Sequence, residues 1–153
     1  MEELIASLKI ALGNTYVMYF KTHSFHWNVE GIMFPQYHEF FQGIYEDVYG
    51  AVDPLAENLR KLEEYAPISL DEIVKHSTIS EENTRIVLIR DMLTSLEVAN
   101  QETISSLNKV FDLATKNKKQ GLANFVADRI DQHEKHGWML RASIKRSEEH
   151  TSE

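Results

Sequence analysis

The sequence has no cysteine, few residues that interrupt a helix and no long hydrophobic run. The absence of cysteine excludes disulfide bonds, thiolate metal sites and cysteine nucleophiles. Only 3 prolines and 6 glycines occur in 153 residues, which leaves long segments free to form helices. An apolar run such as residues 86–89 is far shorter than the ~20 residues that span a membrane. The acidic start, Met1-Glu2-Glu3, differs from a secretory signal or mitochondrial presequence, so we expect a cytoplasmic protein without membrane contact.

Basic residues are also scarce: 16 Lys and Arg stand against 24 Asp and Glu, which gives a net charge of −8. Because lysine and arginine must neutralise phosphates, this balance disfavours DNA binding. Hydrophobic residues make up 42% of the chain, and a chain of this length buries about 68–70% of its unfolded surface. We therefore expect one globular domain over residues 1–147, followed by an acidic, disordered tail over residues 148–153.

Hydrophobic residues recur at helical spacing in four stretches, and strand-like alternation is absent. These stretches cover residues 4–31, 34–62, 89–114 and 122–144. The second and third stretches are joined by a long connection, in which Ser69 and Glu72 predict a capping box at the start of a short helix. One long crossover between the second and third helices is the ferritin-like topology. The sequence therefore predicts an all-α, ferritin-like four-helix bundle whose crossover carries a short helix.

The second stretch has two different helical faces. With successive residues at about 100° steps, an apolar set that includes Phe41 and Val48 lies on one side. His38, Gln42, Glu46, Tyr49, Asp53 and Glu57 lie together on the neighbouring side. Such a face, rich in ligands and tyrosine, favours contact with a partner over simple solvation. Pro54 interrupts this stretch, because proline collides with the carbonyl four residues earlier, at Gly50, and predicts a kink.

Four side chains suited to metal binding follow one another: His26, His38, Asp53 and Glu57. Asp53 and Glu57 are one helical turn apart and could bind one ion together. On one straight helix, however, His38 and Asp53 would lie roughly 22 Å apart, whereas ligands lie about 2.0–2.3 Å from a metal. Two antiparallel copies of the helix would bring His38 of one against Asp53 and Glu57 of the other. Mixed imidazole and carboxylate ligands suit iron, zinc or manganese.

Several segments carry a resemblance to a known family. These are His26-Trp27-Asn28-Val29-Glu30-Gly31, then Phe34, His38 and Phe41, then Val52-Asp53 and Ala56-Glu57, and finally His133-Glu134-Lys135 with Trp138-Met139-Leu140-Arg141. The pattern resembles the Dps family of mini-ferritins over nearly the whole chain. The resemblance implies a shell of twelve four-helix subunits that oxidises ferrous iron, preferentially with hydrogen peroxide rather than oxygen, and stores ferric mineral. It also implies that His26 and His38 come from one subunit and Asp53 and Glu57 from its two-fold mate. Trp27 would be an electron donor beside the site or a buried anchor.

The chain departs from the family pattern at four places. Gln42 stands where the family usually has an aspartate, and its neutral amide is a weaker iron ligand, which leaves the second metal position open. Asn58 replaces a common arginine, no basic terminal tail is present, and residues 117–124 lack the acidic groups expected at an iron entry pore.

Three other functions compete with this one. A di-iron site inside one bundle would use Glu-x-x-His, and no glutamate here has a histidine three residues later. A DNA-protecting protein could use a patch of Lys116, Lys118 and Lys119, although these charges also complement the dipole at a helix C-terminus. A shell that has lost oxidase activity through Gln42 would be a passive metal-binding or structural particle.

Overall fold

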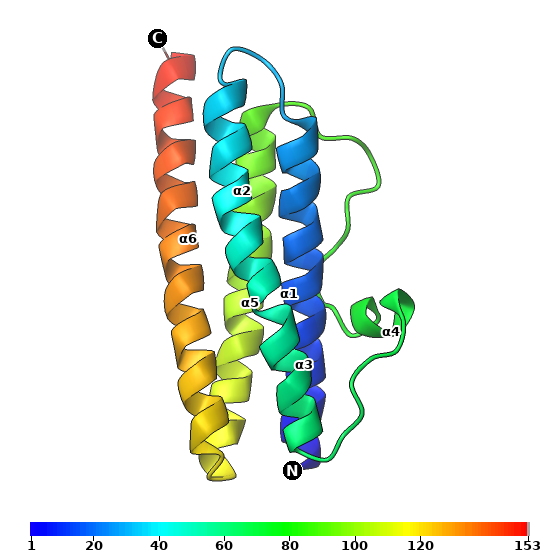
Figure 1. Cartoon of the computed structure of the whole chain (residues 1–153). Coiled ribbons are helices and arrows are strands. Elements are labelled where there is room, and N and C mark those ends of the chain that lie inside the picture. The colour runs from blue at the N-terminus through cyan, green and yellow to red at the C-terminus, as the bar shows by residue number, and fades with distance from the viewer. Residues whose placement is uncertain (153) are drawn as a thin grey trace.

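The computed structural model describes the backbone of residues 1–152 and the side chains of residues 1–145. Its helices are α1 (Glu2–Asn28), α2 (Phe34–Gly50), α3 (Val52–Lys61), α4 (Leu70–Val74), α5 (Ile89–Lys116) and α6 (Gln120–Ser152). Over this part of the chain there is no β-strand, and α1, α2 with α3, α5 and α6 form four parallel or antiparallel columns (Figure 1). The predicted all-α, ferritin-like bundle is confirmed. None of the described helices combines the length and apolar character needed to cross a bilayer.

The core contains two layers of buried side chains along the bundle. One layer includes Leu8, Leu55 and Leu107, and the other includes Phe41 and Leu96. These residues occupy the apolar positions of the helical repeats, and burial of large aliphatic side chains contributes about 1.5–3 kcal/mol each. Since these side chains of α2 and α3 face the core, the opposite face of both helices is available for ligands or partners.

The second helical column is interrupted at Ala51, as the position of Pro54 predicted. Proline lacks the N–H that would bond to Gly50. The Ala51 N–H donates to the Val48 carbonyl at 3.1 Å, one residue closer than in a regular α-helix, and the Leu55 N–H then donates to Ala51 at 3.1 Å. The interruption separates α2, which carries His38, from α3, which carries Asp53 and Glu57.

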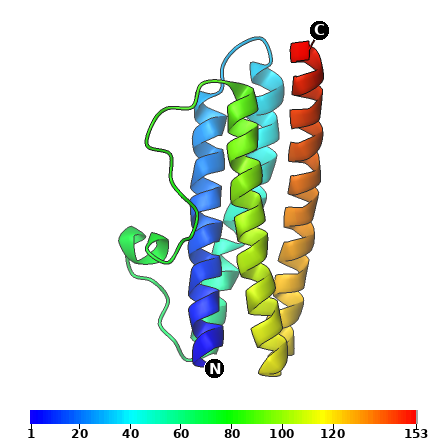
Figure 2. The same ribbon diagram turned by 180° about the vertical axis from the view of Figure 1, so that it is seen from behind.

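The long crossover runs along the outside of the bundle and is fixed to α1 (Figure 2). The capping box at α4 is confirmed, because the Glu72 N–H donates to Ser69 Oγ at 3.1 Å. The Glu72 carboxylate accepts from the Ile68 N–H at 2.8 Å, one residue before the cap. Further along, the fully buried Asn14 side chain of α1 accepts hydrogen bonds from the Thr78 N–H at 2.7 Å and the Ser77 hydroxyl at 2.8 Å.

Helix α6 extends to Ser152 in the backbone. The side chains of residues 146–152 lie outside the described residues, so the domain boundary at residue 147 and the disordered tail after it stay predictions. No proline or glycine follows Gly137, so the local sequence contains nothing that would end the helix. Residue 153 lies outside the described residues.

Candidate metal site

His26 and His38 form a reciprocal pair where α1 ends and α2 begins. The loop between these helices turns at Gly31, whose φ of 110° favours glycine. The His26 Nδ1 donates to the His38 carbonyl at 2.6 Å, and the His38 Nδ1 donates to the His26 carbonyl at 2.7 Å. The two imidazole rings stack, with centroids 3.7 Å apart and planes at 17°.

This arrangement fixes the tautomer of both rings. A carbonyl oxygen only accepts hydrogen bonds, so each Nδ1 must carry the proton. In a neutral imidazole the other nitrogen, Nε2, then has a free lone pair, which is the state that binds a metal. Among the described residues neither Nε2 has a hydrogen-bond partner. His26 and His38 thus present two oriented nitrogen ligands side by side.

Aromatic residues surround the histidine pair. Tyr45 contacts the edge of His26 at a centroid distance of 5.1 Å and stacks on His23 at 3.9 Å. His23 Nδ1 also shares a hydrogen bond of 2.9 Å with the Tyr19 hydroxyl. Burial lowers the pKa of His23, and the neighbouring His26 lowers it further. Trp27 lies 4.2 Å from His23 and is 56% exposed. In the single chain Trp27 is therefore not the buried anchor that one sequence interpretation expected.

Asp53 and Glu57 lie one turn apart on α3, and both are exposed. Within the described part of the chain, neither carboxylate has a hydrogen-bond or ion-pair partner. Asp53 also lines a surface groove between α3, the crossover and Tyr49. Two carboxylates with this spacing and no competing cation are available to an incoming metal ion.

The two pairs lie on different parts of the molecule. The histidines are beside the α1–α2 loop, whereas α3 continues the same column away from that loop (Figure 1). Among the described residues, no three His, Cys, Asp or Glu side chains are grouped closely enough to hold a metal. The single chain thus brings His26 to His38 and places Asp53 near Glu57, but it does not bring one pair to the other.

Gln42 lies on the same side of α2 as His38, one turn further along the helix. Its side chain is half-buried, and its Nε2 donates to Glu46 Oε1 at 2.8 Å. The predicted ligand Gln42 is therefore in the neighbourhood of the histidine pair, with a carboxylate as its partner.

A second polar cluster, which the sequence analysis did not assign, lies inside the bundle. Arg129 donates two hydrogen bonds to the Asp47 carboxylate, at 3.0 and 2.9 Å, and His136 Nε2 donates to the same group at 2.6 Å. His133, which is fully buried, lies beside Arg129 and exchanges hydrogen bonds with Asn100. His133 and His136 thus form hydrogen bonds within the bundle.

The charges of this cluster follow from its surroundings. Burial alone would raise the pKa of Asp47, but the hydrogen bonds and charges of His136 and Arg129 hold it well below its ordinary range. Burial lowers the pKa of His133 to about 3, and the Arg129 charge acts in the same direction. The cluster therefore contains an ionised Asp47–Arg129 pair beside a neutral His133.

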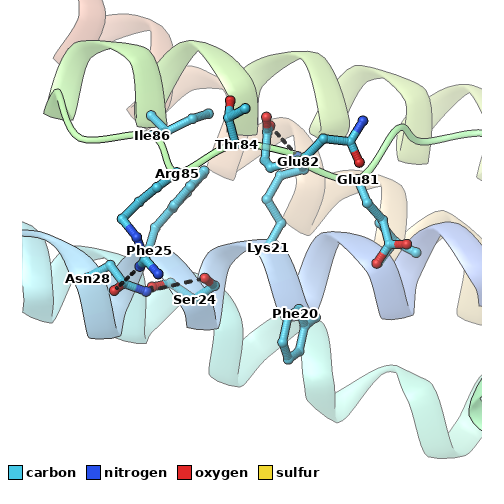
Figure 3. Close-up of a pocket in the computed structure, with 12 residues that line it drawn as sticks. Phe20, Lys21, Ser24, Phe25, Asn28, Glu81, Glu82, Thr84, Arg85 and Ile86 are labelled. Carbon is cyan, nitrogen blue, oxygen red and sulfur yellow. Dashed lines mark hydrogen bonds and ion pairs between the residues drawn. The ribbon is translucent and has the colours of Figure 1, made fainter.

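A pocket between α1 and residues 81–86 is lined by charged side chains that pair with one another (Figure 3). Lys21 is buried, and its ammonium group donates to Glu82 at 2.6 Å and to Ser95 at 3.2 Å. The hydrogen bonds that Glu82 accepts from Lys21 and Ser95 lower its pKa. On the same side, Arg85 donates to Asn28 at 2.9 Å. The polar groups of this pocket bind one another and fasten the crossover to α1.

Comparison with known proteins adds to this geometry. The ferritin-like domain family matches residues 5–149 of the chain. Antigen TpF1 of Treponema pallidum is 30% identical over 129 residues, which cover 84% of this chain and 73% of the antigen. The DNA protection during starvation protein of Brevibacillus brevis is 29% identical over 147 residues, which cover 95% of this chain and 97% of that protein.

A solved structure agrees with these relatives. The Dps protein of Vibrio cholerae O1, described as a ferritin-like diiron-carboxylate protein, superimposes with a TM-score of 0.86 at 28% identity. The superposition covers 94% of this chain and 89% of that one.

Proposed function

We propose, on the premise that this chain belongs to the ferritin-like family as a Dps mini-ferritin, that it oxidises ferrous iron and stores the ferric product. Hydrogen peroxide is the oxidant, and iron is the substrate and cargo rather than a resident cofactor. The reaction balances as two ferrous ions, one peroxide and two water molecules giving two FeOOH units and four protons. It removes iron and peroxide together, which suppresses hydroxyl-radical formation.

The reciprocal histidine pair is the observation that carries this proposal. Histidines that merely fill space have no need of two mutually fixed tautomers with both Nε2 atoms free. In metal sites, a ligand histidine commonly donates its other N–H to a carbonyl or carboxylate, which orients the ring and raises its basicity. His26 and His38 each satisfy that requirement with the backbone of the other.

The carboxylate ligands are supplied by a second subunit. A site for ferric iron needs negatively charged ligands, and the neutral histidine pair provides none. Asp53 and Glu57 provide it, but about fifteen residues of helix, roughly 22 Å, separate His38 from Asp53 in one chain. A two-fold axis presents the same surface of both subunits to each other, so each His26–His38 pair meets the partner's carboxylates and two equal sites form.

Exposed apolar side chains support such subunit contacts. At the α1–α2 end these are Phe20, Trp27, Ile32, Met33 and Phe34, and on the crossover they are Tyr65, Ile68, Leu70, Val87 and Leu88. Exposed apolar surface of this kind is typical of protein contact surfaces. Twelve subunits, the number that the family resemblance implies, would close these contacts into a hollow shell that holds the mineral.

The carboxylates favour oxidation because they stabilise ferric iron more than ferrous iron. Asp53 and Glu57 supply negative charge, while His26 and His38 hold the ion in place. Trp27 lies next to His26 in sequence and contacts His23, so it is positioned to supply an electron when only one iron is bound. Because Gln42 is neutral, one ion is held tightly and the second more weakly.

Anaerobic titration with ferrous iron, followed by a pulse of peroxide and optical detection of ferric iron, tests this function. We expect saturation before the pulse and oxidation much faster than in protein-free solution. Asp53→Ala and Glu57→Ala should each remove most of the oxidation while the helical content is unchanged. Asp112→Ala, which removes an exposed carboxylate of α5, is the matched control and should behave as the parent.

Two results would reject the proposal. If both α3 variants oxidise iron at the parent rate, these carboxylates are not ligands. If the parent protein binds iron but peroxide oxidation does not exceed the protein-free rate, the particle is a passive metal-binding shell.

A further inference from the structure

The hydrogen bond between Gln42 and Glu46 lies beside the proposed site. Both residues are on α2, one turn apart, and Gln42 Nε2 donates to Glu46 Oε1 at 2.8 Å. Glu46 is exposed and has no other hydrogen-bond partner among the described residues. On the helical wheel, both lie within about 80° of His38, on the side that also carries Asp53.

This hydrogen bond fixes which end of the Gln42 amide faces Glu46. A carboxylate only accepts hydrogen bonds, whereas the amide has a donating NH₂ group and an accepting oxygen. The NH₂ group must therefore face Glu46, and the amide oxygen must face away from it. Glu46 lies one turn after Gln42 on α2, and His38 lies one turn before it. Because the NH₂ group of Gln42 faces Glu46, the amide oxygen lies on the side of His38.

From this geometry we propose that Glu46 is a positioning residue for the second metal position. It directs the Gln42 Oε1 toward an ion held by His38, and its charge replaces in part the charge that a neutral glutamine lacks. An amide that donates to a carboxylate is polarised, so its oxygen carries more negative charge. Gln42 and Glu46 together thus act as an oxygen ligand with a carboxylate behind it.

This inference rests on the proposed function, because it assumes that His38 binds an ion. It concerns only the weaker of the two ions and the residues that hold it. The tight ion depends on Asp53 and Glu57 of the partner subunit and is not expected to depend on Glu46. Loss of the weak ion alone would therefore test the role of Glu46, whereas loss of both ions would concern the whole site.

Anaerobic titration of the assembled protein with Co²⁺ tests the role of Glu46, since the visible absorption of Co²⁺ reports its ligands. The parent should bind two ions per site, one tightly and one weakly. Glu46→Gln should weaken the second binding step by about 10- to 100-fold, the effect typical of groups that orient a ligand, and leave the first step unchanged. Glu134→Gln, an exposed glutamate of α6, is the control and should match the parent.

A rescue experiment separates this role from a general effect on the helix. In Gln42→Asp the carboxylate is attached directly to the ligand position, so the second ion should bind more tightly than in the parent. The further change Glu46→Gln should then have little effect, because the orienting carboxylate is no longer needed. If Glu46 merely stabilised α2, Glu46→Gln would weaken binding of the second ion equally in the parent and in Gln42→Asp.

Three outcomes would overturn the role of Glu46, and two would reject the proposed site itself. Parent-like binding of the second ion by Glu46→Gln overturns the positioning role, as does equal weakening in the Gln42→Asp background. Loss of both ions in Glu46→Gln, with normal helical content, also contradicts it. If the parent binds no Co²⁺ at all, or if Asp53→Ala and Glu57→Ala bind both ions as the parent does, the proposed site itself is wrong.

Discussion

Asp47→Asn is the substitution whose cost is best defined by the contacts inside the bundle. The change keeps the shape of the side chain but removes its charge. Arg129, whose side chain is 10% exposed, would lose its counter-charge, and the single amide oxygen of asparagine could not accept all the hydrogen bonds that Arg129 and His136 donate to the carboxylate. Removing one member of a buried ion pair costs about 3–5 kcal/mol, because the remaining charge is left uncompensated.

The magnitude expected here is smaller, because the Asp47 side chain is 28% exposed. Water therefore screens part of the interaction, and we expect a loss of roughly 2–3 kcal/mol in the free energy of unfolding. For a chain of this size the melting temperature should fall by about 2–4 °C per kcal/mol.

Urea unfolding followed by circular dichroism measures this loss, at one fixed subunit concentration because assembly shifts apparent stability. Asp128→Asn is the matched control, since Asp128 is an exposed carboxylate one residue before Arg129. The control should stay within about 0.5 kcal/mol of the parent. A loss no larger than the control in Asp47→Asn would refute the argument that this pair stabilises the bundle.

The close approach of the crossover to α1 and the buried His133 give two further predictions. Gly13→Ala should destabilise the protein by about 1–3 kcal/mol, because a Cβ there would lie 2.8 Å from the Ile73 carbonyl oxygen and 3.0 Å from the Ser77 nitrogen. Gly43→Ala is its control, because a Cβ at residue 43 would have no other atom within 4 Å, and its free energy of unfolding should rise by up to about 1 kcal/mol. Equal effects of the two substitutions in urea unfolding would contradict the close approach of the crossover to Gly13. Since the pKa of His133 is about 3 in the folded protein, against an ordinary value of 6.5, the unfolded chain takes up the proton first as pH falls. Stability should therefore drop by up to about 1.4 kcal/mol per pH unit between these values, and His133→Gln should remove that part of the slope.

Much of the fold was predictable because it depends on local periodicity. The apolar repeat placed Phe41 and Val48 in the core, and both are buried. The serine–glutamate spacing predicted the cap of α4, and Pro54 predicted the interruption of the second helix. Each of these features arises from residues within one or two turns of one another.

The features that were not predictable depend on contacts between distant segments. Asp47 and Arg129 are 82 positions apart, and no local pattern reports how α2 and α6 align along their lengths. The family resemblance implied that His26 and His38 come from one subunit, but their reciprocal hydrogen bonds depend on how Gly31 turns the chain. The tail expected over residues 148–153 stays a prediction, since the side chains there lie outside the described residues.

Complementation between two inactive variants tests most directly that each iron site is shared by two subunits. One variant carries His26→Ala and His38→Ala, and the other carries Asp53→Ala and Glu57→Ala. Each alone should fail to oxidise iron with peroxide. In a mixed two-fold pair, one of the two sites would receive intact histidines from one subunit and intact carboxylates from the other. Random co-assembly in equal amounts should thus restore about a quarter of the parent activity, whereas mixed shells as inactive as either variant would contradict the shared site.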